Sequence, residues 1–305
     1  MTILKRQLEF KIPMRRFDDF KLRKETFIKH FYEVEEHNAI NSTYSLGINE
    51  FSHLTDEELK KQKTGYVYRP FEQSTKPLPK LTNNINKNTN IDWRNNPGVV
   101  MPVQNQGSCG SCWAFAAIAA LEGQSMLQNR QKQKLSEQEI LDCVQHRGCN
   151  GGWDTDAYTH IRSSSGVTTA VQNPYVGFTA GRTCNLNNFR SYGSAVTSWQ
   201  STAGSEQEIL RLLQYGPLFI VFHVADDFYL YRSGIYQDTR NLCYGRNINH
   251  AVLLVGAGTE NGIDYWLAKN SWGVTWGERG YFRLRRNQNL CGIQTYASFP
   301  VVRKV

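Results

Sequence analysis

One cysteine lies where reactive chemistry is expected. Residues 104–113 read Gln-Asn-Gln-Gly-Ser-Cys-Gly-Ser-Cys-Trp and run into the apolar stretch Ala-Phe-Ala-Ala-Ile-Ala-Ala-Leu-Glu, so Cys112 stands where a glycine-rich loop becomes a predicted helix. The first turn of a helix has unpaired backbone N–H groups and the positive end of the helix dipole, and both favour an anion. A cationic partner lowers the pKa of such a thiol further. The sequence therefore predicts a thiolate at Cys112 and requires a basic partner elsewhere.

The segment Cys109-Gly-Ser-Cys112 has three interpretations on spacing alone: a dithiol redox site, a pair of structural cysteines, or a catalytic nucleophile. The neighbouring residues favour the nucleophile. The string Cys-Gly-Ser-Cys-Trp, with Gln106 six positions before Cys112, is the local signature of papain and the cathepsins. The chain resembles the papain family of cysteine proteases, specifically its cathepsin L-like branch with an N-terminal inhibitory propeptide.

The resemblance implies a histidine and an asparagine well downstream of the cysteine. His250 begins the apolar run His-Ala-Val-Leu-Leu-Val-Gly, which is typical of a buried strand, and lies 138 positions after Cys112. Asn270 follows 20 positions later, at the end of a second strand-like run. The other histidines lack such a partner segment: His30, His37, His53, His146, His160 and His223.

Each predicted role follows from the chemistry of amide hydrolysis. The Cys112 thiolate attacks the carbonyl carbon, and His250 as imidazolium protonates the leaving amine. Asn270 accepts a hydrogen bond from the other ring nitrogen and fixes the orientation of the imidazole. By resemblance, Trp272 shields that hydrogen bond from water. The side-chain amide of Gln106 and the backbone N–H of Cys112 donate to the oxyanion.

The resemblance implies an α+β fold with two lobes, a helical left lobe and a β-barrel-like right lobe, preceded by a mainly helical propeptide. The helix that starts at Cys112 is followed by a second helix that ends at Cys143, where Ser136 and Glu139 form a predicted capping box. These two helices belong to the left lobe.

The right lobe is predicted from a helix followed by strand-like runs. Ser205 and Glu208 form another predicted capping box, and the helix ends before Gly216-Pro217. The strand-like runs are 218–224, 250–255, 265–268 and 281–284. The nucleophile and the base then come from different lobes, and the active site is the cleft between them.

The chain of 305 residues exceeds a lone papain-like domain, and the excess lies at the front. Residues 19–65 are charged and helix-like. Six of them have the spacing of the family's propeptide motif E-x3-R-x3-F-x2-N-x3-I-x3-N: Asp19, Arg23, Phe27, His30, Val34 and Asn38. Asp19, His30 and Val34 differ from the motif.

A second propeptide motif, G-x-N-x-F-x-D, is matched from Gly47 to His53 except that His53 replaces the aspartate. Acid weakens the packing of such propeptides, and a histidine also gains charge near pH 6.5. His53 is therefore a hypothetical pH-responsive group, while the alternative is a surface histidine without a regulatory role. Residues 70–90, rich in Pro, Lys, Thr and Asn, read as a cleavable linker. We predict an inhibitory propeptide and linker over 1–84 and a peptidase domain over 85–305.

The seven cysteines indicate an oxidising compartment. Six cysteines allow fifteen pairings, so the sequence does not fix the pairing. The resemblance implies Cys109 with Cys149, Cys143 with Cys184, and Cys243 with Cys291, leaving Cys112 free. Three disulfides favour a lysosomal, endosomal or extracellular location. A thiol-disulfide enzyme using Cys109 and Cys112 would instead have two free thiols.

The first 20 residues do not contain the apolar core of a signal peptide, and no segment reaches the roughly 20 apolar residues of a membrane span. Either the chain begins after a signal peptide or its true first residues are missing. We favour the second explanation because the opening also lacks the tryptophan-containing helix usual in such propeptides.

Substrate binding is predicted partly from the turn Cys149-Asn-Gly-Gly-Trp153. Gly151 and Gly152 have no side chain to block their backbone groups from pairing with an extended substrate. By resemblance, the second subsite on the acyl side is lined by Trp153, Asp154, Val221, Ile248, Ala251 and Tyr296. We expect it to take an apolar or aromatic side chain, or a basic one if Asp154 points inward. No residues resembling an occluding loop stand between Cys109 and Cys149, which favours endopeptidase action.

The expected partners are protein or peptide substrates, the chain's own propeptide as an intramolecular inhibitor, and cystatin-like inhibitors. The net charge of +8 is spread over the chain, and no basic, aromatic-interleaved motif indicates nucleic-acid binding. We expect a monomer that needs neither a metal nor an organic cofactor. The alternative function is a non-catalytic papain-like binding protein, which the intact set of Cys112, His250, Asn270 and Gln106 opposes.

Overall fold

The computed structural model describes residues 17–40, 42–68, 90–144, 147–179, 183–184, 190–243 and 247–305. The helices are α2 (Phe17–Ala39), α3 (Asp56–Lys63), α4 (Cys112–Asn129), α5 (Glu137–Cys143), α6 (Asp154–Ser163) and α7 (Glu206–Leu213). The 3-10 helices are η1 (Trp93–Asn95), η2 (Tyr192–Ser194), η3 (Asp226–Leu230) and η4 (Leu290–Thr295). The strands are β1 (Tyr44–Leu46), β2 (Ile91–Asp92), β3 (Val196–Thr202), β4 (Leu218–Phe222), β5 (Tyr231–Tyr236), β6 (His250–Glu260), β7 (Ile263–Lys269), β8 (Tyr281–Arg285) and β9 (Ala297–Val302).

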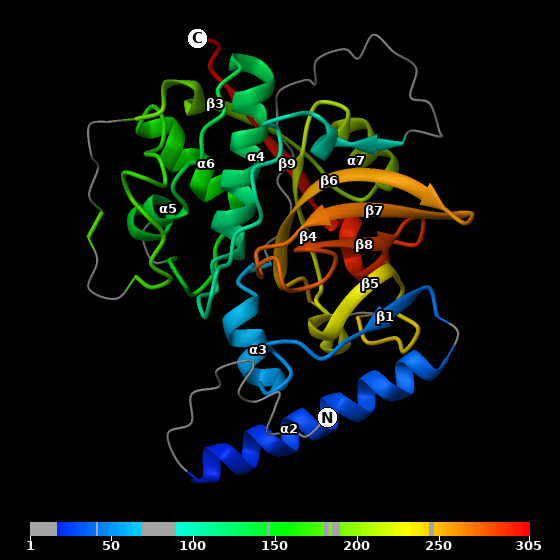
Figure 1. The fold of residues 1–305 in the computed structure, drawn as a ribbon. Coiled ribbons are helices and arrows are strands. Elements are labelled where there is room, and N and C mark those ends of the chain that lie inside the picture. The colour runs from blue at the N-terminus through cyan, green and yellow to red at the C-terminus, as the bar shows by residue number, and fades with distance from the viewer. Residues whose placement is uncertain are drawn as a thin grey trace.

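Most helices and most strands of the peptidase part occupy different sides of the molecule. Figure 1 shows α4, α5 and α6 on one side and the strands β4 to β8 on the other, with the N-terminal helix α2 below them. This arrangement confirms the mixed fold with a helix-rich lobe beside a sheet-rich lobe. The predicted linker lies outside the described residues except for residue 90. Within the described part of the chain, no helix combines the length and apolar character needed to cross a membrane.

Helix α4 is the centre of the helix-rich lobe. Its first half, Cys-Trp-Ala-Phe-Ala-Ala-Ile-Ala-Ala-Leu, is apolar on every side, which is typical of a fully buried helix. Every residue from Cys112 to Ser125 is buried, and α4 contacts α5 and α6 as well as β6 and β9. The helix ends at Arg130, which adopts a left-handed conformation and donates its N–H to the Met126 carbonyl at 3.0 Å. The predicted helix at Cys112 is confirmed.

In each of the two predicted capping boxes, the serine side chain caps the helix that follows it. Ser136 caps α5 by accepting the Glu139 N–H at 3.1 Å, and Ser205 caps α7 by accepting the Glu208 N–H at 3.4 Å. The Glu139 carboxylate, however, accepts from the N–H and the hydroxyl of Thr168 at 2.8 and 2.6 Å. Because Glu139 is buried, these tertiary partners replace the local return bond that the sequence pattern predicts.

The strands form one path in the order β1-β5-β8-β7-β6-β4-β9-β3, with β2 paired to β6. The paired strands are antiparallel except for β5 and β8. The path begins at β1 and ends at β3, so the sheet is open and does not close into the barrel-like form expected for the right lobe. Strands β6 and β7 pair along most of their length, and this pairing fixes the relative positions of His250 and Asn270.

The N-terminal segment adds a strand to the sheet. β1 forms the edge of the sheet and pairs with β5, with Tyr44 opposite Gly234. Gly234 has a φ of +95°, and a Cβ there would lie 2.3 Å from the Thr43 carbonyl oxygen, so the close approach requires glycine. The predicted helical region 19–65 is therefore confirmed only in α2 and α3. The three residues of β1 are too few to show a strand periodicity in the sequence.

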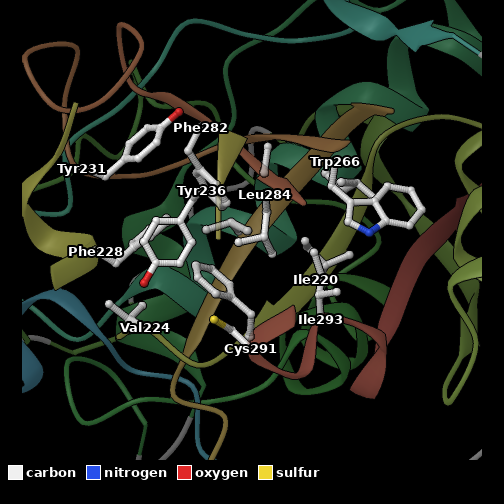
Figure 2. Close-up of a cluster of buried hydrophobic side chains, with 14 of the residues drawn as sticks. Ile220, Val224, Phe228, Tyr231, Tyr236, Trp266, Phe282, Leu284, Cys291 and Ile293 are labelled. Atoms are coloured by element: carbon white, nitrogen blue, oxygen red, sulfur yellow. The ribbon is translucent and has the colours of Figure 1, made fainter. Parts of the chain in front are cut away.

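A cluster of aromatic side chains fills the core of the sheet-rich lobe. Figure 2 shows Phe228, Tyr231, Tyr236 and Phe282 from η3, β5 and β8 packed together. The ring of Phe228 lies 5.0 Å from those of Tyr236 and Phe282, in edge-on geometry that aromatic pairs favour. The cluster continues to Trp276 and so supports the loop that follows β7, where the predicted site residues lie.

Candidate active site

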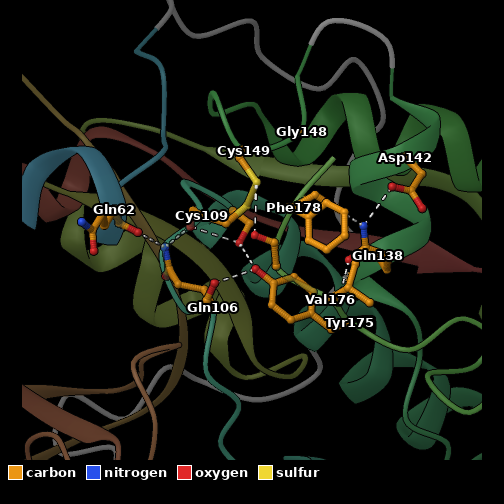
Figure 3. The surroundings of a disulfide bond; sticks show 12 residues. Gln62, Gln106, Cys109, Gln138, Asp142, Gly148, Cys149, Tyr175, Val176 and Phe178 are labelled. Carbon is orange, nitrogen blue, oxygen red and sulfur yellow. Dashed lines mark hydrogen bonds between the residues drawn. A yellow bond between two sulfur atoms is a disulfide. The ribbon is translucent and has the colours of Figure 1, made fainter. Parts of the chain in front are cut away.

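Cys112 is the first residue of α4, and the loop before it is fixed by a disulfide. Cys109 is bonded to Cys149 (Figure 3). The Gly110 N–H donates to the Cys149 carbonyl at 3.1 Å. Cys143–Cys184 and Cys243–Cys291 are the other two disulfides, so the structure contains the three pairs that the resemblance implied. All seven cysteines lie in described ranges, and among them Cys112 is free. Because Cys109 is bonded to Cys149, the structure does not contain the dithiol of a redox enzyme.

His250 and Asn270 come from the start of β6 and the residue after β7. His250 Nε2 lies 2.9 Å from Asn270 Oδ1, and because an amide oxygen only accepts, Nε2 carries the proton. Asn270 Oδ1 also accepts the Ser271 N–H at 2.8 Å, which fixes the amide. His250 Nδ1 is buried and makes no hydrogen bond to any described residue. Ala251, next to His250, lies in one buried cluster with Cys112, and its backbone acts to lower the pKa of the thiol, so residues of the two lobes meet at this point.

Trp272 covers the imidazole of His250. The two ring centroids are 5.0 Å apart, and the indole is fully buried. The Tyr229 ring also stacks with the indole of Trp272, with the ring centroids 5.3 Å apart. The indole N–H donates to the Lys63 carbonyl at 3.0 Å. The predicted shielding position of Trp272 thus agrees with the geometry, and the N-terminal segment contributes to the cover through Lys63 and Phe51.

Burial favours the neutral forms of the Cys112 thiol and the His250 imidazole in this form of the protein. Both side chains are completely inaccessible to solvent. Burial raises the pKa of Cys112 to about 12, and backbone hydrogen bonds reduce the effect. Burial lowers the pKa of His250 to about 4, against the hydrogen bond to Asn270. The thiolate and imidazolium predicted from the sequence are therefore disfavoured while the N-terminal segment covers the site, because desolvation penalises each charge.

The N-terminal segment runs through the cleft beside Cys112. The N–H groups of Gly65 and Tyr66 both donate to the Asn249 carbonyl, at 3.0 and 2.9 Å, and the Gly152 N–H donates to the Gly65 carbonyl at 3.0 Å. A Cβ on Gly65 would lie 2.0 Å from the Gly110 carbonyl oxygen, so the backbone approaches more closely than any other residue permits. Gly152, in the turn predicted to bind substrate, thus pairs its backbone with the chain's own N-terminal segment.

Gln106 is fixed beside the nucleophile loop. Its Nε2 donates to the Cys109 carbonyl at 2.8 Å and, more weakly, to the Gln62 carbonyl at 3.4 Å (Figure 3). Its Oε1 accepts the Ser271 hydroxyl at 2.6 Å, and its backbone N–H donates to the Ser271 carbonyl at 2.8 Å. The amide donor predicted for the oxyanion therefore faces a carbonyl of the N-terminal segment.

Tyr66 lies among the side chains predicted for the second subsite. It belongs to one buried cluster with Cys112 and the predicted lining residues Val221, Ile248, Ala251 and Tyr296, while Trp153 packs against that cluster. Trp153 Nε1 also donates to the Val67 carbonyl, and a Cβ on Gly151 would lie 3.1 Å from the Val67 side chain.

Two details of this pocket were not predicted. The Asp154 carboxylate does not point inward as a free acid, because its Oδ2 accepts the Tyr296 hydroxyl at 2.8 Å and the Ser298 hydroxyl. Phe219 lies 6.2 Å from both the Tyr66 and the Tyr296 rings. The signal for Phe219 was available, since alternate residues of a strand share one face and Phe219 precedes Val221 by two positions.

The N-terminal helices are held together by an ion pair. Arg23 donates two hydrogen bonds to the Glu58 carboxylate, one of them at 2.6 Å, and a further one to the His53 carbonyl at 3.2 Å. The hydrogen bonds from Arg23 lower the pKa of Glu58 to about 2. Burial, together with the nearby Arg23 charge, lowers the pKa of His53.

The other motif positions connect α2 to the segment that follows it. His30 is buried, and its Nδ1 lies 3.0 Å from the Ser52 carbonyl oxygen. The Asn38 side chain donates to the Leu46 carbonyl at 2.9 Å and accepts the Leu46 N–H at 3.0 Å. Histidine at position 30 thus makes a cross-segment contact although the family motif has asparagine there.

Comparisons with known proteins agree with this arrangement. The family described as papain family cysteine protease matches residues 87–301, and the cathepsin propeptide inhibitor domain matches residues 7–59. The chain is 38% identical to cysteine proteinase 3 of Solanum lycopersicum, covering 93% of this chain and 80% of that protein. It is also 38% identical to a cathepsin L-like proteinase of Fasciola hepatica, covering 93% and 88%. The solved digestive procathepsin L2 of Tenebrio molitor is 32% identical, with a TM-score of 0.82 over 97% of this chain and 98% of that one.

Proposed function

Because the chain belongs to the papain family of cysteine proteases and carries its own cathepsin propeptide inhibitor domain, we propose that Cys112, His250 and Asn270 cleave peptide bonds through a covalent acyl-enzyme. The observation that carries this assignment is the 2.9 Å hydrogen bond from His250 to Asn270. It leaves Nδ1 of His250 as the only basic atom of the imidazole, in a buried position where the neighbouring Ala251 backbone reaches the thiol of Cys112.

The reaction begins once the propeptide leaves the cleft. Water then reaches the site, the desolvation penalty falls, and Cys112 transfers its proton to His250 Nδ1. The thiolate forms a bond to the substrate carbonyl carbon, and the carbonyl π electrons move to the oxygen. The Gln106 amide and the Cys112 N–H donate to this oxyanion.

Collapse of the tetrahedral intermediate breaks the carbon–nitrogen bond. The His250 imidazolium gives its proton to the leaving amine and becomes a neutral base again. It next takes a proton from water, whose oxygen attacks the thioester. The carboxylic acid product leaves, and the proton returns to the Cys112 sulfur. Asn270 keeps the ring oriented through both proton transfers.

The substrate is an extended polypeptide bound through its backbone. The hydrogen bonds of the propeptide to Gly152 and Asn249 support this mode, because an extended peptide offers the same groups. The Tyr66 ring in the second subsite supports a preference for an apolar or aromatic side chain there. The engagement of Asp154 by Tyr296 and Ser298 argues against the basic alternative. The absence of occluding-loop residues in the sequence between Cys109 and Cys149 supports endopeptidase action.

The protein is a zymogen whose propeptide inhibits the peptidase domain within the same chain. We place the boundary between residues 84 and 85, which is compatible with the two family matches at 7–59 and 87–301. Three disulfides support a lysosomal, endosomal or extracellular location. The mature enzyme would act as a monomer, and its emptied cleft would admit cystatin-like inhibitors.

Hydrolysis of a fluorogenic dipeptidyl-arginine amide at about pH 5.5 tests this function. Two such substrates are compared, one with an aromatic residue and one with arginine at the position that binds the second subsite on the acyl side. The wild type and Cys112→Ala are incubated in acid first. Activity that appears with loss of about 85 residues in the wild type, and is absent from the variant, supports the protease. Folded and processed wild-type protein that binds the peptide without turnover would favour the non-catalytic binding protein.

A further inference from the structure

The phenol of Tyr175 contacts the two segments that present the proposed oxyanion donors. Tyr175 lies in the chain between α6 and η2, and its hydroxyl donates to the Gln106 backbone carbonyl at 2.6 Å (Figure 3). The same oxygen lies 2.9 Å from the hydroxyl of Ser111, the residue before Cys112. The Tyr175 ring also packs edge-on against Phe115 of α4, with centroids 4.8 Å apart. One side chain therefore braces the loop that holds Gln106 and the start of the helix that begins at Cys112.

The directions of these hydrogen bonds follow from the number of protons. The Gln106 carbonyl can only accept, so Tyr175 gives its single hydroxyl proton there. Ser111 must then donate to the Tyr175 oxygen. Its contact with the Cys109 carbonyl, at 3.3 Å, is the weaker of its two donor contacts. Tyr175 thus holds both neighbours at once, one as an acceptor and one as a donor.

This arrangement changes what Ser111 does at the helix terminus. Ser111 is the N-cap of α4, where a serine side chain ordinarily accepts a hydrogen bond from the second or third helical N–H. Here its side chain makes no capping bond. The Ala114 N–H donates instead to the Ser111 backbone carbonyl at 2.9 Å, and the Trp113 backbone acts to lower the pKa of the Cys112 thiol. Because a capping hydroxyl would bind the Trp113 or Ala114 N–H, holding the Ser111 hydroxyl away leaves the Trp113 N–H available to the reacting atoms.

We propose that Tyr175 is a positioning residue that sets the side-chain amide of Gln106 and the N–H groups at the start of α4 in the geometry that stabilises the oxyanion. Its hydroxyl bonds Gln106 and Ser111, so Tyr175 acts through these two residues. The inference rests on the proposed protease function and on the role assigned there to Gln106. Because the oxyanion exists only in the transition state, losing this brace lowers kcat and leaves KM nearly unchanged.

The test compares Tyr175→Phe with wild type after acid activation of the full chain. Removing an oxyanion donor itself costs about 100- to 1000-fold in kcat, so loosening two donors without removing either should cost about 10-fold. We expect a KM within about twofold of the wild-type value. We also expect the acid limb of the pH–rate profile to move to higher pH, because the released Ser111 hydroxyl competes for the Trp113 N–H. Tyr175 is half-buried and loses a hydrogen bond in this variant, so some loss of thermal stability is expected as well.

Tyr231→Phe is the matched control. Its hydroxyl also donates to a backbone carbonyl, that of Gly234 at 2.7 Å, and accepts an N–H, that of Arg283 at 3.3 Å, but in the sheet-rich lobe. This variant should lose a similar amount of stability and keep the wild-type kcat. If Tyr175→Phe likewise loses stability and keeps the wild-type kcat and pH profile, Tyr175 is only structural and the proposal is overturned.

Two more variants separate the possible failures. Ser111→Ala breaks the contact with Tyr175 without releasing a competing hydroxyl, so it should lower kcat less than Tyr175→Phe does and leave the acid limb in place. In the double variant it should add no further loss of kcat and should return the acid limb toward that of the wild type. If Tyr175→Phe does not fold, Ser111→Ala decides alone, and a wild-type kcat there overturns the proposal. Gln106→Ala tests the underlying function: an unchanged kcat in this variant refutes the oxyanion assignment itself, whereas a large loss there beside an unaffected Tyr175→Phe refutes only the inference.

Discussion

Replacing Glu58 by glutamine should release the propeptide more readily. Glu58 receives two hydrogen bonds from Arg23 across the contact between α2 and α3, and glutamine keeps the shape of the side chain while removing its charge. The amide oxygen can still accept the Thr55 N–H, which the carboxylate accepts at 2.9 Å, so the cap of α3 is retained. The substitution therefore isolates the ion pair between the two propeptide helices.

The magnitude follows from the pKa of Glu58, which hydrogen bonds from Arg23 and, to a lesser extent, from Thr55 lower from 4.5 to about 2. At neutral pH such a difference corresponds to about 3 kcal/mol of folded-state stabilisation as an upper bound. The Glu58 side chain is 31% exposed, and screening by solvent reduces the contribution to about 1–2 kcal/mol. Since about 1.4 kcal/mol is a factor of ten, the population with a detached propeptide should rise about 5- to 30-fold.

The assay is the first-order rate of autoactivation at pH 6, followed with a fluorogenic peptide. Processing should follow the detached population when detachment is fast relative to cleavage, so the rate should rise by the same factor. The pKa of Glu58 is lower in the folded protein, so its stabilisation is present above about 4.5 and is lost as pH falls toward 2. The difference between variant and wild type should therefore shrink over that range.

The control is Glu57→Gln, one position earlier in α3, where the glutamate is exposed. It removes the same charge without touching the contact with Arg23 and should activate at the wild-type rate. If Glu58→Gln also activates at the wild-type rate at pH 6, the ion pair does not hold the propeptide in place.

Three other predictions concern the propeptide and the buried thiol. Because the pKa of His53 is lowered in the folded protein, folding stability is lost as pH falls below about 6.5, so His53→Asn should move the midpoint of acid activation to lower pH; an unchanged midpoint refutes the hypothesis. Iodoacetamide should alkylate Cys112 at pH 6.5 at least about 100-fold faster in the mature enzyme than in the zymogen, because burial raises the thiol pKa to about 12; equal rates measured by mass spectrometry would contradict this. Gly65→Ala places a Cβ 2.0 Å from the Gly110 carbonyl oxygen and should push the propeptide backbone out of its position, so the zymogen should show activity at pH 7 before processing. An unprocessed variant without activity would contradict this and would show that the backbone accommodates the methyl group by a small shift.

The sequence indicated the candidate catalytic residues because their signals are local. The position of the Cys112 thiol depends on a loop that becomes a helix, and consecutive residues of the sequence indicate that transition. His250 and Asn270 each stand at an end of an apolar run, and antiparallel pairing of two such runs brings their ends together. The position of the α4 helix follows from its apolar sequence in the same way.

The propeptide was predicted from its motifs, but its path was not. The spacing of Arg23 and Asn38 indicated α2, whereas β1 comes from three residues whose partner strand β5 lies almost 190 positions away in the chain. The passage of Gly65 and Tyr66 through the cleft depends on hydrogen bonds to Asn249 and Gly152, which only the assembled lobes place together.

Tertiary contacts alone decided the state of the buried polar groups. The Asp154 carboxylate is bound by Tyr296 and Ser298, residues more than 140 positions away, so no local pattern could show which way it points. The charge expected on Cys112 depends on desolvation by a segment some 50 positions earlier. Motif and spacing determined which side chains could react in this protein, because helix and strand geometry is local. Only the tertiary structure decided when they can react, since hydration and hydrogen-bond partners depend on which distant segments meet.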